Sequence, residues 1–333
     1  MATHTEDGMT KPGISLKFAL IVLALLTWSM NAAPLKGQTQ PQPQKPEIVS
    51  AVPVTMTVGL SVPSGKQMPS VTADDVIVKQ GKDRRKVIGW TPATGDHAAL
   101  DLYILIDDVC DPVLGSHLDD IRTFVNSLPP TASVAVGYMR NATVQVAQDF
   151  TTDHDQVAKA LRMPTGTVGT FASPYLSVID LMKRWPRTKA RREIVMITDG
   201  IDRAHRHFGP MSVTTDEDVA AEIAQRTDTI IHTVYAPGTG RYRRNYWEAN
   251  NGQITIAKLS DDTGGESFFL GFQNPVTLAP YFDEIATVLG NQYFLRFEAM
   301  PGKKDGQQSV EISTPVAGVE ISAADAVWVP AAK

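Results

Sequence analysis

The feature that most constrains this chain is an apolar run, residues 102–106, that stops abruptly at a group of acids. Three carboxylates follow within five residues: Asp107, Asp108 and Asp111. A continuous apolar run predicts a strand buried on both faces, which is typical of the centre of a parallel sheet. A second run, residues 193–197, leads in the same way to Asp199. Because ligands bind at the carboxyl ends of strands in open α/β sheets, the acids predict a cation site at one edge of the sheet.

The pattern of apolar residues divides the chain into three parts. Residues 51–96 alternate apolar and polar side chains, which predicts an N-terminal unit of half-buried strands. Strands and helices alternate over residues 97–290, which predicts a doubly wound, mainly parallel α/β sheet. Residues 291–333 return to period two. Because each β segment is too short for a stable domain of its own, we expect the two to pair into a small β-sandwich with the α/β domain inserted between them.

Particular elements of the α/β part follow from the same patterns. The strands are expected at 100–106, 133–139, 143–148, 193–198, 229–235 and 267–270. One helix should carry the apolar stripe Leu118, Ile121, Val125 and Leu128, with Ser116 as its N-cap. A second helix should end before Pro186, because proline cannot continue a helix.

The first residues have the pattern of an export signal. Lys17 precedes 13 apolar-rich residues, 18–30, and small residues follow them, so residues 1–33 are expected to be a cleaved signal peptide. The alternative is an uncleaved membrane anchor, but a membrane span needs about 20 apolar residues. Residues 34–50 are rich in Pro and Gln and predict an extended linker. We therefore expect a periplasmic, cell-surface or extracellular protein with no membrane span in the mature chain.

Composition and one loop bear on the partner. The net charge of -5 argues against nucleic acid, which needs a basic face. The loop after the strand at 229–235 should lie at the same edge as the acids, and it contains residues enriched in protein interfaces, Tyr242, Arg243, Arg244 and Trp247. We expect a protein partner there. The alternative is that the arginines pair with local carboxylates and the aromatic rings pack inward.

The sequence around Asp107 and Asp199 resembles that of a known family. It is similar to secreted bacterial von Willebrand factor type A (VWA) proteins, specifically the acidobacterial-type "VWFA-related" group, from Val52 to about Trp328. Four landmarks carry the resemblance: the Asp-ended first strand, Gly169–Tyr175 opening a helix, Ile197–Gly200, and Leu259–Gly265 before the last strand. The resemblance implies a VWA (Rossmann-like) fold and a non-enzymatic module for protein interaction or adhesion.

The resemblance also implies a metal-ion-dependent adhesion site (MIDAS) for Mg²⁺ or Ca²⁺. The family pattern is Asp-x-Ser-x-Ser on the first loop, Thr on the second and Asp on the third. Neutral hydroxyl ligands leave the cation electrophilic enough to take a partner carboxylate. The pattern's two aspartates fall on Asp107 and Asp199, its serines on Val109 and Asp111, and its threonine on Ser173. The implied ligands are Asp107, Asp111, Ser173 and Asp199, with Asp108 and Thr170 as alternatives.

Two departures from the family pattern leave three interpretations open. Val109 has no ligand atom, and Asp111 replaces a neutral hydroxyl with a charge. In the first interpretation the acids still hold a cation; in the second the site is degenerate and they cap nearby loops and helix starts, leaving a metal-free structural or assembly domain. The third, remote interpretation is a metal-dependent phosphohydrolase with Asp107 as nucleophile, but Val109 stands where that class needs a second acid.

Overall fold

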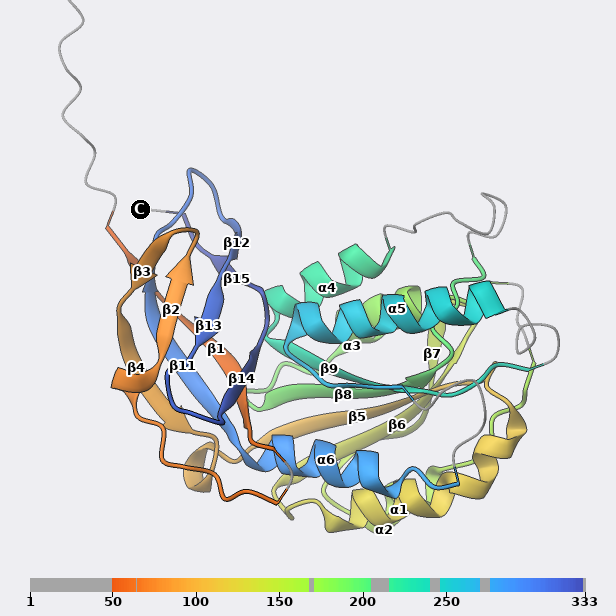
Figure 1. Ribbon diagram of the computed structural model, residues 1–333. Helices are drawn as coiled ribbons and strands as arrows, with labels where there is room; N and C mark the ends of the chain where they lie inside the picture. The colour runs from red at the N-terminus through yellow and green to blue at the C-terminus, as the bar shows by residue number, and fades with distance from the viewer. Residues whose placement is uncertain are drawn as a thin grey trace, which may run out of the picture. The chain divides into compact units, whose positions relative to one another are not determined.

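The computed structural model describes residues 50–63, 65–167, 171–204, 216–239, 246–269 and 276–331. The expected signal peptide, 1–33, and all of the expected linker, 34–50, except its last residue lie outside these ranges. Within them, α/β elements are flanked by short strands at both ends of the described chain (Figure 1).

The central sheet contains six strands in the order β10-β9-β8-β5-β6-β7. Its members are β5 (Leu100–Asp107), β6 (Ala132–Arg140), β7 (Thr143–Thr151), β8 (Arg191–Thr198), β9 (Thr229–Tyr235) and β10 (Ser267–Phe268). All neighbours are parallel except β6 and β7. The chain starts at β5, adds strands on one side and then adds strands on the other, which is the order of a doubly wound sheet. The predicted fold class is confirmed.

Helices cover both faces of this sheet (Figure 1). One face carries α1 (Leu118–Ser127), α2 (His154–Ala160) and α6 (Ala279–Gly290), and the other carries α3 (Pro174–Arg184), α4 (Asp216–Arg226) and α5 (Tyr246–Thr263). Alternate residues of β5 point into the two layers: Leu102, Ile104 and Ile106 into the first, Tyr103 and Leu105 into the second. Burial on both faces explains why this strand reads as an unbroken apolar run.

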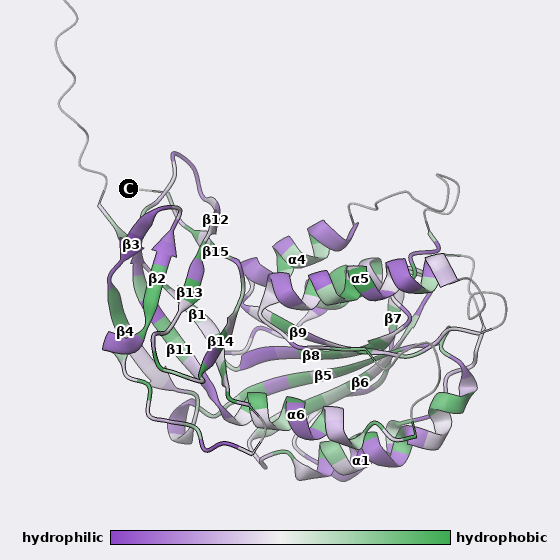
Figure 2. Cartoon of the chain, in the orientation of Figure 1, coloured by the Kyte–Doolittle hydropathy of each residue, from purple (hydrophilic) through white to green (hydrophobic). Residues whose placement is uncertain are grey.

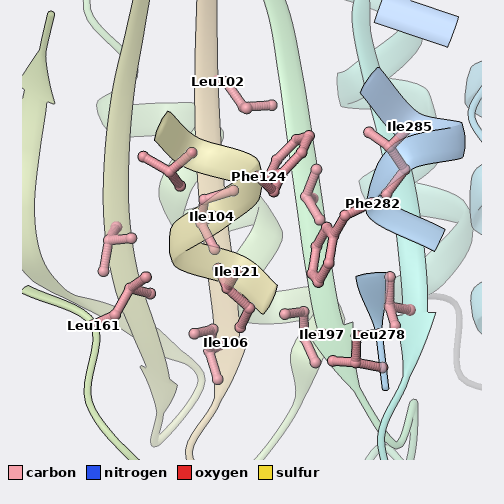
Figure 3. Packing of buried hydrophobic residues seen from close by; sticks show 14 of the residues in the cluster. Leu102, Ile104, Ile106, Ile121, Phe124, Leu161, Ile197, Leu278, Phe282 and Ile285 are labelled. Carbon is pink, nitrogen blue, oxygen red and sulfur yellow. The ribbon is translucent and has the colours of Figure 1, made fainter. Parts of the chain in front are cut away.

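The layer that contains α1, α2 and α6 is held together by packing of large apolar side chains (Figure 3). Phe124 of α1 stacks on Phe282 of α6 with ring centroids 5.1 Å apart, which joins these two helices. The helices α1, α4 and α5 mix hydrophobic and hydrophilic residues, whereas the central strands are mostly hydrophobic (Figure 2). This is the pattern of helices with one buried face.

The N-terminal and C-terminal strands form a second unit, which we call the base. Its strands are β1 (Val52–Ser61), β2 (Ile77–Gln80), β3 (Asp83–Arg85), β4 (Val87–Pro92), β11 (Gln292–Ala299), β12 (Gly306–Ser309), β13 (Glu311–Ser313), β14 (Glu320–Ala323) and β15 (Ala326–Val329). They form sheets in the orders β14-β1-β11-β4, β13-β2-β3 and β12-β15. Strands from the two ends of the described chain thus share one core, as their small size predicts.

Short helical turns join several of these elements: η1 (Ala73–Asp75), η2 (Gly95–His97) and η3 (Pro112–His117). The turn η3 corrects one prediction. Ser116 is not the N-cap of α1, because it lies inside η3 and its hydroxyl donates to the Val113 carbonyl; α1 begins after His117 instead. The expected end of α3 before Pro186 is confirmed.

Candidate functional site

The acids at the ends of β5 and β8 meet where the sheet order reverses. Asp107 is the last residue of β5 and Asp199 directly follows β8, and these two strands are parallel neighbours. Their carboxyl ends point away from the base (Figure 1). We call the loops at this edge the rim. In a doubly wound sheet the reversal point opens a crevice between the loops, and ligands bind there.

Asp107 is held by hydrogen bonds from its own surroundings. Its Oδ1 accepts from the backbone N–H of Val109 at 3.1 Å, and its Oδ2 accepts from the Thr198 hydroxyl at 2.7 Å. Burial and the nearby Asp199 carboxylate raise the pKa of Asp107 to about 6, while Arg203 and Thr198 oppose that rise. The environment therefore disfavours a second negative charge beside Asp199.

Asp199 forms a buried ion pair with Arg203. Arg203 Nη1 donates to Asp199 Oδ1 at 3.0 Å, and Nη2 donates to Oδ2. The two side chains are 1% and 2% exposed. Asp199 Oδ1 also accepts from the backbone N–H of Ile201 at 3.0 Å. Both oxygens of this carboxylate are thus engaged by the protein itself, in the two-pronged geometry that suits a guanidinium.

Asp108 has an arginine of its own. Arg162 donates to both oxygens of Asp108, at 2.8 and 3.2 Å, and Thr165 N–H donates to Oδ1 at 3.1 Å. Burial raises the pKa of Asp108, but the hydrogen bonds from Arg162 and Thr165 outweigh it and leave the pKa below its ordinary value. Asp108 is therefore a charged, paired carboxylate.

The remaining predicted ligands cap helical turns. Asp111 is the N-cap of η3, and its Oδ1 accepts from Val113 N–H at 3.0 Å. Ser173 is the N-cap of α3, and its Oγ accepts from Leu176 N–H at 3.3 Å. Such caps satisfy the free N–H groups at a helix start. Thr170 lies outside the described residues.

These contacts do not fit a divalent cation as they stand. Mg²⁺ and Ca²⁺ need six or more oxygen ligands, including carboxylates free to face the ion. Here Asp199 faces Arg203 and Asp108 faces Arg162. Within the described ranges, no three Asp, Glu, His or Cys side chains come together in a way that could hold a metal. The cap formed by Asp111 is of the kind that the second interpretation of the sequence expects, whereas the arginine pairs were not expected. Cation binding itself stays a prediction for measurement.

Sequence reasoning missed both arginines. Arg203 follows Asp199 by four residues, but that spacing predicts a side-chain contact in a helix, and this segment is a loop. Arg162 follows α2 and reaches Asp108 across 54 residues of sequence. Only a tertiary structure shows such pairings.

Large apolar side chains are exposed on several loops of the rim. Val113 in η3 is 46% exposed, Met163 after α2 is 54% exposed, and Phe171 before α3 is 56% exposed. Two of these segments touch, since a Cβ on Gly115 of η3 would meet Met163 at 3.0 Å. The same edge includes the start of α5, where Trp247 is 77% exposed.

The predicted partner loop is described only at its end. Tyr242, Arg243 and Arg244 lie outside the described residues. Trp247 is one residue into α5, and its ring meets that of Tyr246 edge-on, with centroids 5.9 Å apart. Trp247 does not pack inward, as the alternative interpretation of this loop expects, because most of its surface is exposed. None of the described helices is long and apolar enough to cross a membrane.

Comparisons with known proteins give structural neighbours only. The sequence matches no family profile and no curated protein. Among solved structures, the chain is similar to a von Willebrand factor type A protein from Catenulispora acidiphila, with 11% identity over 86% of this chain and 75% of that one and a TM-score of 0.42. It is also similar to the conserved hypothetical protein BatB from Bacteroides thetaiotaomicron, with 15% identity over 57% of this chain and 97% of that one and a TM-score of 0.41.

A third neighbour is an aerotolerance-related membrane protein from Bacteroides fragilis, with 12% identity over 57% of this chain and 98% of that one and a TM-score of 0.40. Because identities and TM-scores are low, we take nothing about function from these structures and base the fold on the strand order. The order β10-β9-β8-β5-β6-β7, the helices on both faces and the Asp-ended first strand make the central unit of this chain a doubly wound, mainly parallel α/β domain.

Proposed function

We propose that this chain is an exported, non-enzymatic protein-interaction module that binds its partner through the rim of a VWA-type domain. The observation that carries the proposal is the contrast between two groups of rim residues. Asp107, Asp108 and Asp199 are buried, and the last two are paired with arginines of the same chain. In contrast, the large apolar side chains Val113, Met163, Phe171 and Trp247 are exposed. Export rests on the N-terminal sequence, which predicts a cleaved signal peptide.

The exposed side chains support a protein partner. A single exposed apolar residue is ordinary, but several on adjoining loops form the kind of patch that marks an interaction site. The loops adjoin through hydrogen bonds: Thr239 N–H donates to the Val109 carbonyl at 3.2 Å, and its hydroxyl donates to the Gly166 carbonyl at 2.9 Å. Aromatic residues such as Trp247 are enriched among the residues that dominate binding energy.

The state of the acids argues against the phosphohydrolase alternative. A nucleophilic carboxylate must reach its substrate, but Asp107 is 4% exposed and both of its oxygens accept hydrogen bonds. The same contacts favour an interaction that does not pass through a metal. The alternative is a metal-free structural domain that assembles through other surfaces, and such a domain would not need the exposed rim side chains for capture of a partner.

The test compares capture of a partner by rim and control variants. Immobilised wild-type protein is incubated with cell-envelope extract, and the bound proteins are quantified with and without EDTA. We expect the triple variant Val113→Ser/Met163→Ser/Trp247→Ser to lose a captured protein. The matched control is Val146→Ser, because Val146 is 45% exposed but lies within the edge strand β7 and not on a rim loop.

Three outcomes separate the possibilities. Loss of the captured protein by the rim variant alone, with no effect of EDTA, supports the proposal. Equal capture by the rim variant and the control contradicts it. Release of the partner by EDTA would instead support the metal-dependent adhesion site that the family resemblance implies.

A further inference from the structure

The side chain of Arg203 brings a fixed positive charge to the acidic ends of β5 and β8. Its guanidinium forms the two-pronged pair with Asp199 and also lies within Coulombic range of Asp107. We propose that Arg203 is a built-in replacement for the divalent cation of VWA domains: it neutralises the acidic strand ends from within the chain. This inference does not depend on whether the rim binds a partner.

The position of Arg203 is fixed by three segments of chain. Its backbone N–H donates to the Ala172 carbonyl at 2.6 Å, which ties it to the loop before α3. Its Nη1 also donates to the Ile201 carbonyl at 3.0 Å. Gly238 covers the pair from the loop after β9, because a Cβ there would overlap Asp199 Oδ2 and approach Arg203 Nη2 to 3.1 Å. The guanidinium therefore occupies a site built for it.

The chemistry of a guanidinium suits this place. It is weakly hydrated and stays charged, so burying it costs less than burying an ammonium, and its planar fork matches a carboxylate. One guanidinium faces two buried acids, and the second acid, Asp107, is held by neutral donors, Val109 N–H and the Thr198 hydroxyl. A bound Mg²⁺ or Ca²⁺ would bring two positive charges to the same acids and would have to displace Arg203 from Asp199.

Two consequences follow for metal binding. The wild-type protein should be indifferent to divalent cations, since its acidic strand ends already have their counter-charge. Removing the guanidinium should leave Asp107 and Asp199 as buried carboxylates without one, which raises the free energy of the native state. Oxygen ligands on neighbouring strands then resemble the donor set of a hard cation, so the variant should gain stability from added metal.

The experiment uses the full chain and measures the melting temperature (Tm) in EDTA, in Mg²⁺ and in Ca²⁺, with calorimetric titration of each metal. Arg203→Ser is the test variant. Arg162→Ser is the matched control, because Arg162 makes the same two-pronged contact with the adjacent acid, Asp108, but is 42% exposed. We expect the melting temperature of the wild type to be the same in all three buffers. That of Arg162→Ser should also not change with metal, although it should lie below the wild-type value because Asp108 is 1% exposed. Arg203→Ser should melt lower in EDTA and recover in metal.

Several results would overturn the proposal. Heat of Mg²⁺ or Ca²⁺ binding by the wild type, or a wild-type Tm that rises with metal, would show that Arg203 does not replace the ion. So would an Arg203→Ser protein as stable as the wild type in EDTA. If Arg203→Ser does not fold in any buffer, the double variant Asp199→Asn/Arg203→Ser decides: recovery of folding without metal supports a counter-charge, and continued failure to fold shows that Arg203 acts through packing instead.

Discussion

Replacement of Arg203 by Met tests how strongly the buried pair is coupled. The change keeps an unbranched side chain of similar length but leaves the Asp199 carboxylate buried without its cation. The pair is almost fully buried, at 1% and 2% exposure, so solvent does not screen it. Removing one partner of such a pair costs about 3–5 kcal/mol of unfolding free energy. At about 2–4 °C per kcal/mol for a protein of this size class, the lower figure corresponds to a fall in Tm of roughly 6–12 °C.

The prediction becomes specific in a double-mutant cycle with Asp199→Asn. Each single variant removes one charge of the Asp199–Arg203 pair and keeps the other, whereas the double variant removes both, so the double variant should be no less stable than either single one. The coupling between the two sites should then reach about 3 kcal/mol. Urea unfolding followed by circular dichroism, in EDTA, measures all four proteins. Additive losses, with the double variant the least stable of the four, would refute the idea that the two charges depend on each other.

Two further predictions concern the core and the junction with the base. Phe282→Ala should lower the free energy of unfolding by about 3–5 kcal/mol, because this ring is 2% exposed and stacks on Phe124. Urea unfolding measures the loss, and Val276→Ala is the control that should be unaffected, because Val276 is 99% exposed. A loss below about 1 kcal/mol for Phe282→Ala would contradict the packing. Asp228 accepts hydrogen bonds from the backbone and hydroxyl of Thr57 in β1 at 2.9 and 2.8 Å, and burial raises its pKa. At pH values between the ordinary carboxyl pKa of 3.8 and the raised pKa, Asp228 holds a proton in the native state but has lost it in the unfolded state. The unfolding free energy of the wild type should therefore fall with rising pH in this range, relative to that of Asp228→Asn. Parallel pH profiles of the two unfolding free energies would contradict this.

Much of the fold can be predicted from the sequence because the central strands are buried on both faces. The strand expected at 229–235 is observed as Thr229–Tyr235, and the one expected at 193–198 as Arg191–Thr198. Their apolar runs leave little choice of secondary structure. The strand β3 (Asp83–Arg85) was missed, because three polar residues at a sheet edge carry no hydrophobic period.

The candidate site is predictable in its location but not in its contacts. The order of the strands brings Asp107 and Asp199 together. Their location at one edge of the sheet can therefore be predicted from the pattern of buried strands. What they bind depends on side chains that arrive from elsewhere in the chain. Arg203 reaches Asp199 within a loop that has no regular period, and Arg162 reaches Asp108 from beyond α2. Charge pairing of this kind leaves no signal in local sequence.

The pairing of β1 has a consequence for the order of events during synthesis. β1 lies between β11 and β14, and its residue Val52 pairs with Ala299. Because chains emerge from the N-terminus, β1 is made before either strand that it pairs with, and it has no sheet to join until the whole α/β domain has been made. Contacts so distant in sequence form slowly. The base is therefore expected to close only after all strands of the α/β domain have been synthesised.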